Sequence, residues 1–380
     1  MKDRVLYIVS GDLWGGAEAQ VLLQTQALKA LGWQVHVLLF NEGETFSRYA
    51  AAGLDCHLLR ETPGIPVFSR KLVNRIRQIA PDIIAAHGYK ESFAAFAASL
   101  CCRIPWISTF HGLSENYTGF AAFKSRFYMA MYLHLSRIHA SRIIAVSSSL
   151  ARQLGIEHLR KLVIITNVAQ CAADASAPTV FGGRPAIAFV GRLAPVKRAD
   201  LALQAFAILL RQREDEGKEK PHLYVIGDGP ERPKLSVLAN SPPLAGCVHF
   251  LGFRNDAASL IGQADALLIS SDSEGIPTVL LEAIAAVTPV ASTDVGGISD
   301  VLAGLPGYPS ALAPRGDAPQ LAIALARVIE MRLNESEKTA IRTAFADHFS
   351  PATAAQKLDA MYREILAKST NKEITPCTKA

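Results

Sequence analysis

The sequence predicts an α/β protein made of parallel sheets, and three observations lead to this prediction. Short apolar runs rich in β-branched residues recur along the chain. They alternate with segments of helical periodicity, as parallel strands joined by crossover helices do. Glycine-rich or polar motifs follow the strands, where open α/β sheets bind their ligands. In order, the expected strands are 5–10, 34–40, 55–59, 82–87, 106–110, 142–146, 162–166, 186–190, 223–227, 248–252, 266–270, 289–292 and 308–312.

The chain is expected to form two domains of similar size. Its 380 residues are more than one hydrophobic core usually organises. Residues 171–184 are small and rich in proline and glycine, as an interdomain linker should be. We therefore predict Rossmann-like, doubly wound domains over 1–170 and 185–348. A closing helix over 351–368 could pack back on the N-terminal domain, and 369–380 is predicted to form a flexible tail.

Composition and charge argue against several classes of protein. Half of the residues are hydrophobic and 19% are charged, which is typical of a soluble globular protein. The net charge of +5, without a helix-turn-helix or an aromatic RNA-binding motif, argues against nucleic acid as a partner. Six cysteines without metal-ligand spacing indicate thiols in a reducing compartment. No apolar run is long enough for a signal peptide or a bilayer span, so a cytoplasmic protein is expected.

One segment places two carboxylates around the start of a predicted helix. Seven residues separate Glu274 from Glu282, and Pro277 between them suits the first helical position. The amides that follow lack acceptors within the helix, and with the macrodipole they form a seat for an anion. They belong to Thr278, Val279 and Leu280. A phosphate on this seat, with a hydroxyl-rich group beside each carboxylate, describes a sugar nucleotide. A simple helix cap is the alternative.

Two cations follow the first strand of the second half. Arg192 and Lys197 lie on a predicted strand-to-helix loop, where they could grip a diphosphate. Fixed cations stabilise the negative charge that grows on a leaving diphosphate. The chain has no D-x-D motif, so we expect positive side chains and a helix N-terminus to replace a metal ion. A solvated basic loop is the alternative interpretation.

The N-terminal half offers a histidine and a glycine pair. His111 ends an apolar strand, where it could hydrogen-bond a sugar hydroxyl or polarise the reacting centre. A core histidine with satisfied nitrogens is the alternative. Gly15 and Gly16 follow the first strand and let the backbone approach a phosphate or sugar closely. No G-x-G-x-x-G or G-x-x-x-x-G-K-[ST] motif occurs, which argues against an NAD enzyme, a kinase or an ATPase.

Taken in order, these motifs resemble those of the retaining glycosyltransferases of family 4, which have the GT-B fold and an E-x7-E signature. The resemblance covers nearly the whole chain. One departure is Val287, where relatives often carry a glycine after the signature helix. The matching positions are Gly15-Gly16, His111-Gly112, Gly191-Arg192, Lys197, Gly227-Asp-Gly-Pro230, Gly252-Phe253, Glu274, Glu282 and Gly296-Gly297.

The resemblance implies two Rossmann-like domains that face a central cleft, with the nucleotide sugar bound by the C-terminal domain. Arg192 and Lys197 would bind the donor diphosphate, and Glu282 the ribose. Glu274 would hold the transferred sugar by positioning it, although a nucleophile or general base is a rival role. His111 would approach the reacting face of the sugar. The other implied donor contacts are Gly15, Gly16, Gly227, Phe253, Arg254, Gly275, Ile276, Thr278 and Val279; no metal cofactor is implied.

Two basic segments suggest a surface that touches membranes. Residues 68–77 and 120–142 combine arginines and lysines with aromatic residues in a helical pattern. They could rest on anionic lipid at the inner face of the cell membrane, which suits a lipid-linked or growing saccharide as the acceptor. The alternative is a core-facing helix with a solvated basic side. For the whole chain, a non-catalytic sugar-nucleotide-binding subunit and a nucleotide-sugar epimerase remain alternatives to a transferase.

Overall fold

A computed structural model of the chain describes residues 3–11, 14–60, 65–112, 119–170, 180–182 and 185–373. For 65–66, 119–122 and 369–373 it describes the backbone alone. The chain divides into two compact units, an N-terminal unit formed by Met1–Val168 with Pro351–Ala380 and a C-terminal unit formed by Ala169–Ser350.

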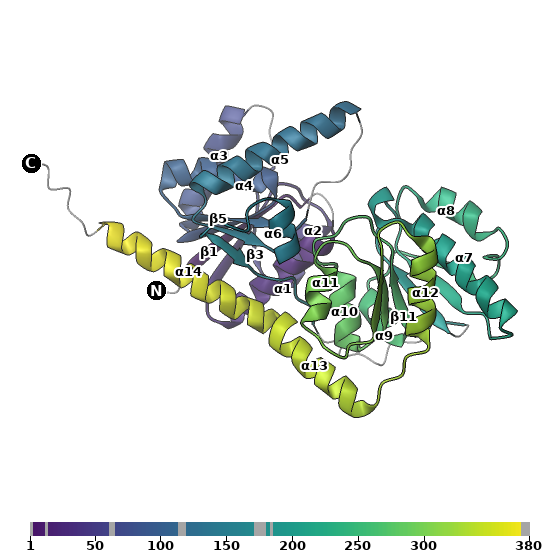
Figure 1. Ribbon diagram of the computed structural model, residues 1–380. Helices are drawn as coiled ribbons and strands as arrows, with labels where there is room; N and C mark the ends of the chain where they lie inside the picture. Colours follow the sequence, from purple (N-terminus) through teal and green to yellow (C-terminus); the bar gives the residue numbers. More distant parts are fainter. Residues whose placement is uncertain are drawn as a thin grey trace, which may run out of the picture. The chain divides into compact units, whose positions relative to one another are not determined.

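The N-terminal unit is built on a seven-stranded parallel sheet in the order β3-β2-β1-β4-β5-β6-β7. Figure 1 labels its strands β1, β3 and β5. The order reverses between β1 and β4, which makes the unit doubly wound with its switch point there. Its strands are β1 (Arg4–Val9), β2 (Gln34–Leu39), β3 (Asp55–Leu58), β4 (Ile83–His87), β5 (Trp106–Phe110), β6 (Arg142–Ala145) and β7 (Leu162–Ile164).

Helices cover both faces of this sheet because alternate strand residues point to opposite sides, and both sets are apolar. One core holds Leu6, Ile8 and residues of α3 (Ile65–Ile79), α4 (Tyr89–Cys102), α5 (Gly119–His139) and α6 (Ser148–Gln153). The opposite core holds Val5, Tyr7 and residues of α1 (Gly16–Ala30), α2 (Glu44–Ala51) and α14 (Pro351–Glu373).

The C-terminal unit repeats this arrangement with six parallel strands in the order β10-β9-β8-β11-β12-β13. Its switch point lies between β8 and β11. The strands are β8 (Ala186–Val190), β9 (His222–Ile226), β10 (Val248–Gly252), β11 (Ala266–Ile269), β12 (Val290–Thr293) and β13 (Ser310–Ala313).

Two helical layers again enclose the sheet. A short 3-10 helix, η1 (Pro195–Lys197), precedes the first long helix. One core contains α7 (Ala199–Asp215), α8 (Arg232–Ala239) and α12 (Ala318–Ile329). The other contains α9 (Ala257–Gln263), α10 (Thr278–Ala286), α11 (Ile298–Ala303) and α13 (Glu335–Phe349).

The doubly wound α/β prediction is confirmed, and every expected strand is present with no end displaced by more than two residues. Helix α14 continues to Glu373, five residues beyond the expected 368, so 369–373 are helical where a flexible tail was predicted. Residues 374–380 lie outside the described residues. So does most of the expected linker, although Phe181 is buried against Tyr224 in the C-terminal unit.

Val287 stands where the resemblance leads us to expect a glycine, and the backbone of this position shows why glycine would suit it. It is the C-cap of α10 and adopts a left-handed backbone with φ of 61°. A β-branched residue takes this conformation at a cost, whereas glycine takes it freely. Here the Val287 side chain is buried in the core of the C-terminal unit, which offsets part of that cost.

No helix in the described part of the chain joins enough length to enough hydropathy for a bilayer crossing.

Candidate active site

Several of the predicted donor residues of the C-terminal unit lie at its switch point. The loop after β8 carries Lys197, and the loop after the adjacent strand β11 carries Glu274. Lys197 Nζ donates a hydrogen bond to Glu274 Oε1 at 2.6 Å, although the two residues are 77 positions apart in the chain. The switch point therefore brings together the cation and the carboxylate that the sequence assigned to one site.

Neighbouring groups hold this ion pair in place. The Ser271 hydroxyl donates to the same Glu274 oxygen at 2.6 Å. The carboxylate side chain is only 11% exposed, against 28% for the lysine. Burial with two donors fixes the orientation of the Glu274 carboxylate and leaves the ammonium more open to a ligand.

The two loops are also joined through their backbones. Ser270 donates from its hydroxyl to the carbonyls of Lys197 and Arg198 at 3.0 and 2.7 Å. The Asp272 amide donates to the Val196 carbonyl at 2.8 Å. Arg198 in turn forms ion pairs with Asp200 and Asp272. These bonds make the Lys197–Glu274 pair part of a rigid frame.

Helix α10 starts one residue later than predicted. Pro277 is the N-cap, with φ of −64° and ψ of 129°, and Thr278 is the first helical residue. The Leu280 amide donates to the Pro277 carbonyl at 3.2 Å, so the prediction that it is available to an anion is wrong. Thr278 and Val279 are the first two residues of α10, so no carbonyl of the helix comes before them for their amides to reach. These two amides therefore still face the N-terminal end of α10. The anion seat is therefore smaller than expected.

Glu282 lies one turn inside α10 and is partly buried. Burial raises the pKa of its carboxyl to about 7. The carboxyl therefore keeps its proton closer to neutral pH than an ordinary glutamate does, and in that form it can donate as well as accept hydrogen bonds. That dual capacity suits a partner with vicinal hydroxyls.

A glycine pair packs beneath the Glu274 loop. A Cβ on Gly296 would lie 2.1 Å from the Glu274 carbonyl oxygen, and φ at Gly296 is +62°. The amide of Gly297 donates to the Gly275 carbonyl at 2.7 Å. Buried Ile276 continues the loop into the core. The Gly296-Gly297 motif therefore fixes the position of the backbone that carries Glu274 and Gly275.

Gly227 serves the site through backbone packing. Its φ is +135°, and a Cβ there would meet the Gly191 carbonyl oxygen at 2.0 Å. The Gly191 amide donates to the Ile226 carbonyl at 3.0 Å, and the Leu193 amide donates to the Asp228 carbonyl at 2.9 Å. The glycines at 191 and 227 thus allow the loops after β8 and β9 to touch, which fixes the start of the Lys197 loop.

The remaining donor candidates lie at the same edge of this sheet. Arg192 is exposed at the end of β8. Phe253 follows β10 and is 59% exposed, so its ring is open to stacking. Arg254 forms a pair with Asp256 at 2.6 Å. Because β10 is the edge strand, Phe253 and Arg254 lie two strands away from Lys197.

In the N-terminal unit, Gly15 is the N-cap of α1 and Gly16 its first residue. They follow β1, so their amides face the carboxyl edge of the sheet. This is the place where the sequence predicted a close backbone approach to a ligand.

His111 follows β5 at the same edge and pairs with a second histidine. Its Nε2 lies 2.8 Å from His87 Nδ1, and the rings stack at 5.1 Å. Burial lowers the pKa of His111 to about 4, so the ring is neutral at neutral pH. Its buried Nδ1 has no hydrogen-bond partner among the residues that the structure describes. The alternative of a satisfied core histidine is therefore not supported for this nitrogen.

His87 connects His111 to the core. Its ring stacks on Tyr7 at 5.2 Å, and the Tyr7 hydroxyl lies 3.0 Å from that of Tyr362 in α14. Burial, with His111 nearby, holds the pKa of His87 well below its usual value. This row of rings fixes the His111 imidazole.

Glu91 is a candidate that sequence reasoning missed. It lies in the first turn of α4, at the switch point of the N-terminal unit, and only 4% of it is exposed. Burial raises the pKa of Glu91 to about 7 against the opposing effect of hydrogen bonds from Ser10. A Cβ on Gly88 would lie 2.5 Å from its Oε2. A glycine followed by an acid in the turn after 82–87 was the available signal.

The fold and the geometry of the site together indicate the class of protein. Comparisons with known proteins agree with that class. Solved structures with the GT-B glycosyltransferase architecture superpose on the chain. Anabaena Alr3699/HepE in complex with UDP and glucose has a TM-score of 0.77 and 19% identity over 95% of this chain and 100% of that one. The fold is therefore GT-B.

The protein-family model described as Glycosyltransferase Family 4 matches residues 14–168 of the chain. The family model described as Glycosyl transferases group 1 matches residues 184–331. The chain belongs to this glycosyltransferase family.

Curated relatives match over shorter stretches. A 2-deoxystreptamine glucosyltransferase of Streptomyces kanamyceticus is 34% identical over 189 residues, 49% of this chain and 47% of the relative. A putative teichuronic acid biosynthesis glycosyltransferase, TuaC, of Bacillus subtilis is 28% identical over 232 residues, 59% of this chain and 56% of the relative. The chain thus spans about half the length of the curated relatives that it matches.

Proposed function

We propose that this chain is a retaining glycosyltransferase that moves a sugar from a nucleotide-diphosphate donor to a hydroxyl acceptor. The observation that carries the proposal is the 2.6 Å pair between Lys197 and Glu274 beside the N-terminus of α10. A cation, a carboxylate and helix amides at a switch point match the groups of an activated sugar.

In this proposal the C-terminal unit binds the donor without a metal ion. The diphosphate lies against the amides of Thr278 and Val279, with Lys197 and Arg192 as its cations. Negative charge grows on the diphosphate as the glycosidic bond breaks, and the fixed cations stabilise that charge most in the transition state. Glu282 accepts from the ribose hydroxyls, and the exposed Phe253 ring stacks on the base.

Glu274 positions the transferred sugar. Its carboxylate already accepts from Lys197 and Ser271 through Oε1, which leaves Oε2 for sugar hydroxyls. The departing phosphate oxygen takes the proton of the incoming hydroxyl on the same face, so the anomeric configuration is retained. A covalent intermediate on Glu274 is the rival chemistry.

In this proposal the N-terminal unit receives the acceptor. His111 offers the nitrogen Nδ1 to a sugar hydroxyl, because its other nitrogen is engaged with His87. Gly16 lies at the start of α1, where its amide suits an anionic group. Glu91 at the switch point of this unit is a candidate contact for acceptor hydroxyls.

The acceptor is a separate part of the proposal. We propose a lipid-linked or growing saccharide in polysaccharide assembly at the inner face of the cell membrane. The likeness to a putative teichuronic acid biosynthesis glycosyltransferase supports a saccharide acceptor, whereas the other relative described above is named for 2-deoxystreptamine.

Product analysis with a labelled nucleotide sugar tests the function. The full chain is expected to yield a labelled saccharide with the anomeric configuration of the donor. Recovery of unreacted donor in every acceptor and donor combination would favour a binding-only subunit. A changed sugar on the recovered nucleotide would favour an epimerase. A thermal-shift screen of nucleotide sugars selects the donor first, since a tight ligand raises the melting temperature.

An exposed apolar surface supports contact with membrane lipid. Phe123, Phe127 and Met131 recur every four residues of α5, so they lie on one face, and the first two are 68% and 56% exposed. Lys124 and Arg126 are exposed beside them. Helices α3 and α4 of the same sheet face add Val67, Leu100, Arg70, Lys71 and Arg77 to the exposed residues.

We expect the protein to bind vesicles that contain anionic lipid and to release them as salt rises. Replacing Phe123 and Phe127 with serine should weaken this binding about ten- to a hundredfold, because each ring loses roughly 1 kcal/mol or more of apolar burial. Cosedimentation measures the effect. The matched control exchanges Val237 and Ile323, which are equally exposed on the C-terminal unit, for serine. Equal vesicle binding by both double variants would remove α5 from the proposal.

A further inference from the structure

Two histidines and an aspartate converge on one side of the N-terminal unit, away from the carboxyl edge of its sheet. His36 lies on β2, and Asp55 and His57 lie on the edge strand β3. The register pairs His36 with Asp55 and Leu38 with His57, so all three side chains point to the face covered by α3. Asp55 is the first residue of β3, which places the group toward the amino ends of the strands.

The distances within this group are those between ligands of one ion. His36 Nδ1 lies 3.2 Å from His57 Nε2 and 2.9 Å from Asp55 Oδ2. His57 Nε2 lies 3.6 Å from Asp55 Oδ1. Ligands bound to zinc at about 2.0–2.1 Å in a tetrahedron are separated by about 3.3–3.4 Å. One ion can therefore reach all three residues without moving the backbone.

Hydrogen bonds among the three residues do not satisfy them. Histidine Nδ1 and Nε2 carry one proton or one lone pair each, and a carboxylate only accepts. A single proton on His36 Nδ1 would have to serve both Asp55 and His57. The 3.6 Å separation of His57 from Asp55 is too long for a good hydrogen bond. A cation among the three satisfies every lone pair at once.

Another histidine pair in the chain provides an internal comparison. His222 Nδ1 and His249 Nε2 lie 2.8 Å apart on neighbouring strands β9 and β10, with stacked rings. Across the described ranges, only the group with Asp55 assembles three ligand atoms within 4.8 Å of one another. The carboxylate distinguishes that site from an ordinary cross-strand histidine pair.

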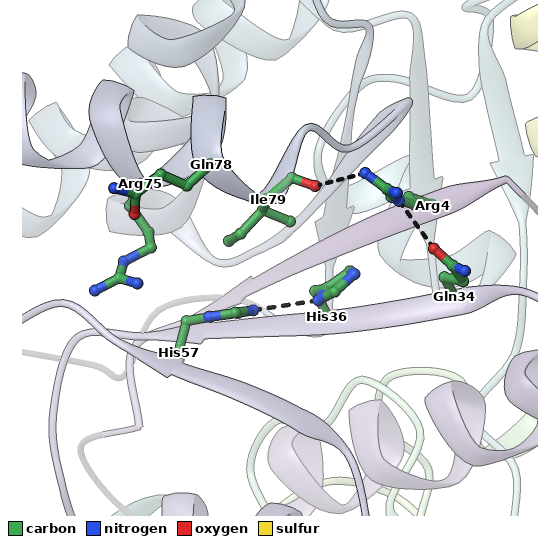
Figure 2. Close-up of a pocket in the computed structure, with 7 residues that line it drawn as sticks. All are labelled: Arg4, Gln34, His36, His57, Arg75, Gln78 and Ile79. Atoms are coloured by element: carbon green, nitrogen blue, oxygen red, sulfur yellow. Dashed lines mark hydrogen bonds between the residues drawn. The ribbon is translucent and has the colours of Figure 1, made fainter.

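A pocket of about 260 Å³ opens beside the histidines. Figure 2 shows His36 and His57 on neighbouring strands, with Arg75, Gln78 and Ile79 of α3 across from them. Two side chains that line the pocket are cationic, but Arg4 is bonded to Gln34 and to the Ile79 carbonyl. Arg75 is the charge that opposes a cation here.

We propose that His36, Asp55 and His57 bind one divalent transition-metal ion, with Zn²⁺ as the best match to two imidazoles and a carboxylate. Three protein ligands leave a coordination position open to water from the pocket. The ion joins β2 to the four-residue edge strand β3, so its effect is to stabilise that edge. The site is independent of the proposed transfer reaction, whose residues in this unit follow the carboxyl ends of the strands.

Metal titration of the full chain, stripped with a chelator, tests the site. We expect one Zn²⁺ per chain by calorimetry, a raised melting temperature, and visible absorption from Co²⁺ in a low-symmetry site. Asp55→Asn and His57→Gln should each weaken binding at least about tenfold and abolish the Co²⁺ bands. Asp55 is 58% exposed, so its conservative variant is expected to fold. His249→Ala should bind as the wild type does.

Arg75→Gln tests whether the pocket binds a cation or an anion. Loss of this cation should tighten Zn²⁺ binding, whereas it would weaken binding of an anion such as inorganic phosphate in the same pocket. Zn²⁺ binding that is unchanged by Asp55→Asn and His57→Gln would overturn the proposal. So would a melting temperature that rises with phosphate but not with Zn²⁺.

Discussion

Replacing Lys197 with alanine is expected to lower kcat by about 10²–10³-fold and to leave the protein folded. The ammonium is the charge closest to Glu274 at the start of α10, and in the proposed reaction it stabilises the departing diphosphate. Loss of one preorganised group that meets developing charge costs about 2.7–4 kcal/mol in the transition state. Initial rates with the labelled donor measure the loss, and thermal unfolding checks the fold.

Stability should change little in this variant because Ser271 still donates to Glu274. We expect a loss of no more than about 1–2 kcal/mol in the free energy of unfolding. Lys338→Ala is the matched control, since Lys338 forms a pair with Glu335 at the same 2.6 Å in α13 of the same unit. A kcat within twofold of wild type for Lys197→Ala would remove this lysine from the reaction.

Glu274 belongs to the same prediction, and its variants separate its two possible roles. Glu274→Ala should be as damaging as Lys197→Ala. Glu274→Gln keeps an acceptor for Ser271 and for the sugar, so a positioning role predicts substantial remaining turnover, whereas a nucleophile role predicts none. Because the two side chains are in contact, the double variant should lose less than the product of the single losses.

The sequence predicted the layers and the meeting of Lys197 with Glu274 because both depend on local pattern. Buried parallel strands are read as short apolar runs, so each strand was found within two residues. Loops that follow such strands share an edge, and this places Lys197 and Glu274 together without any knowledge of their distance. Their direct 2.6 Å bond was not predictable, because both were expected to face the ligand.

The errors and omissions have physical causes as well. The start of α10 depends on ψ of Pro277, and proline restricts only φ. Glu91 was missed because an acid in the first turn of a helix usually interacts with the macrodipole at the surface, and burial is invisible in the sequence. His36, Asp55 and His57 meet through the register of two strands, and neither strand shows that register alone.

Gly296→Ala is expected to lower kcat by about a hundredfold, although residue 296 has no side chain that could touch a ligand. A Cβ there would lie 2.1 Å from the Glu274 carbonyl oxygen and 3.0 Å from that of Gly275. Carbonyl oxygens of the backbone cannot change rotamer, so the loop must shift away. A displacement of about 1 Å at a positioning residue costs about 10²-fold in rate.

The same substitution should also destabilise the C-terminal unit by roughly 2–3 kcal/mol. Alanine at φ of +62° costs about 1–2 kcal/mol, and the lost bond from the Gly297 amide to Gly275 costs about 1 more. Gly316→Ala separates strain from displacement, because Gly316 has φ of +77° with no atom within 4 Å of an added Cβ. That control should lose about 1–2 kcal/mol of stability and keep full turnover. If Gly296→Ala and Gly316→Ala turn over equally fast at a temperature where both are folded, the position of the Glu274 backbone does not control the reaction.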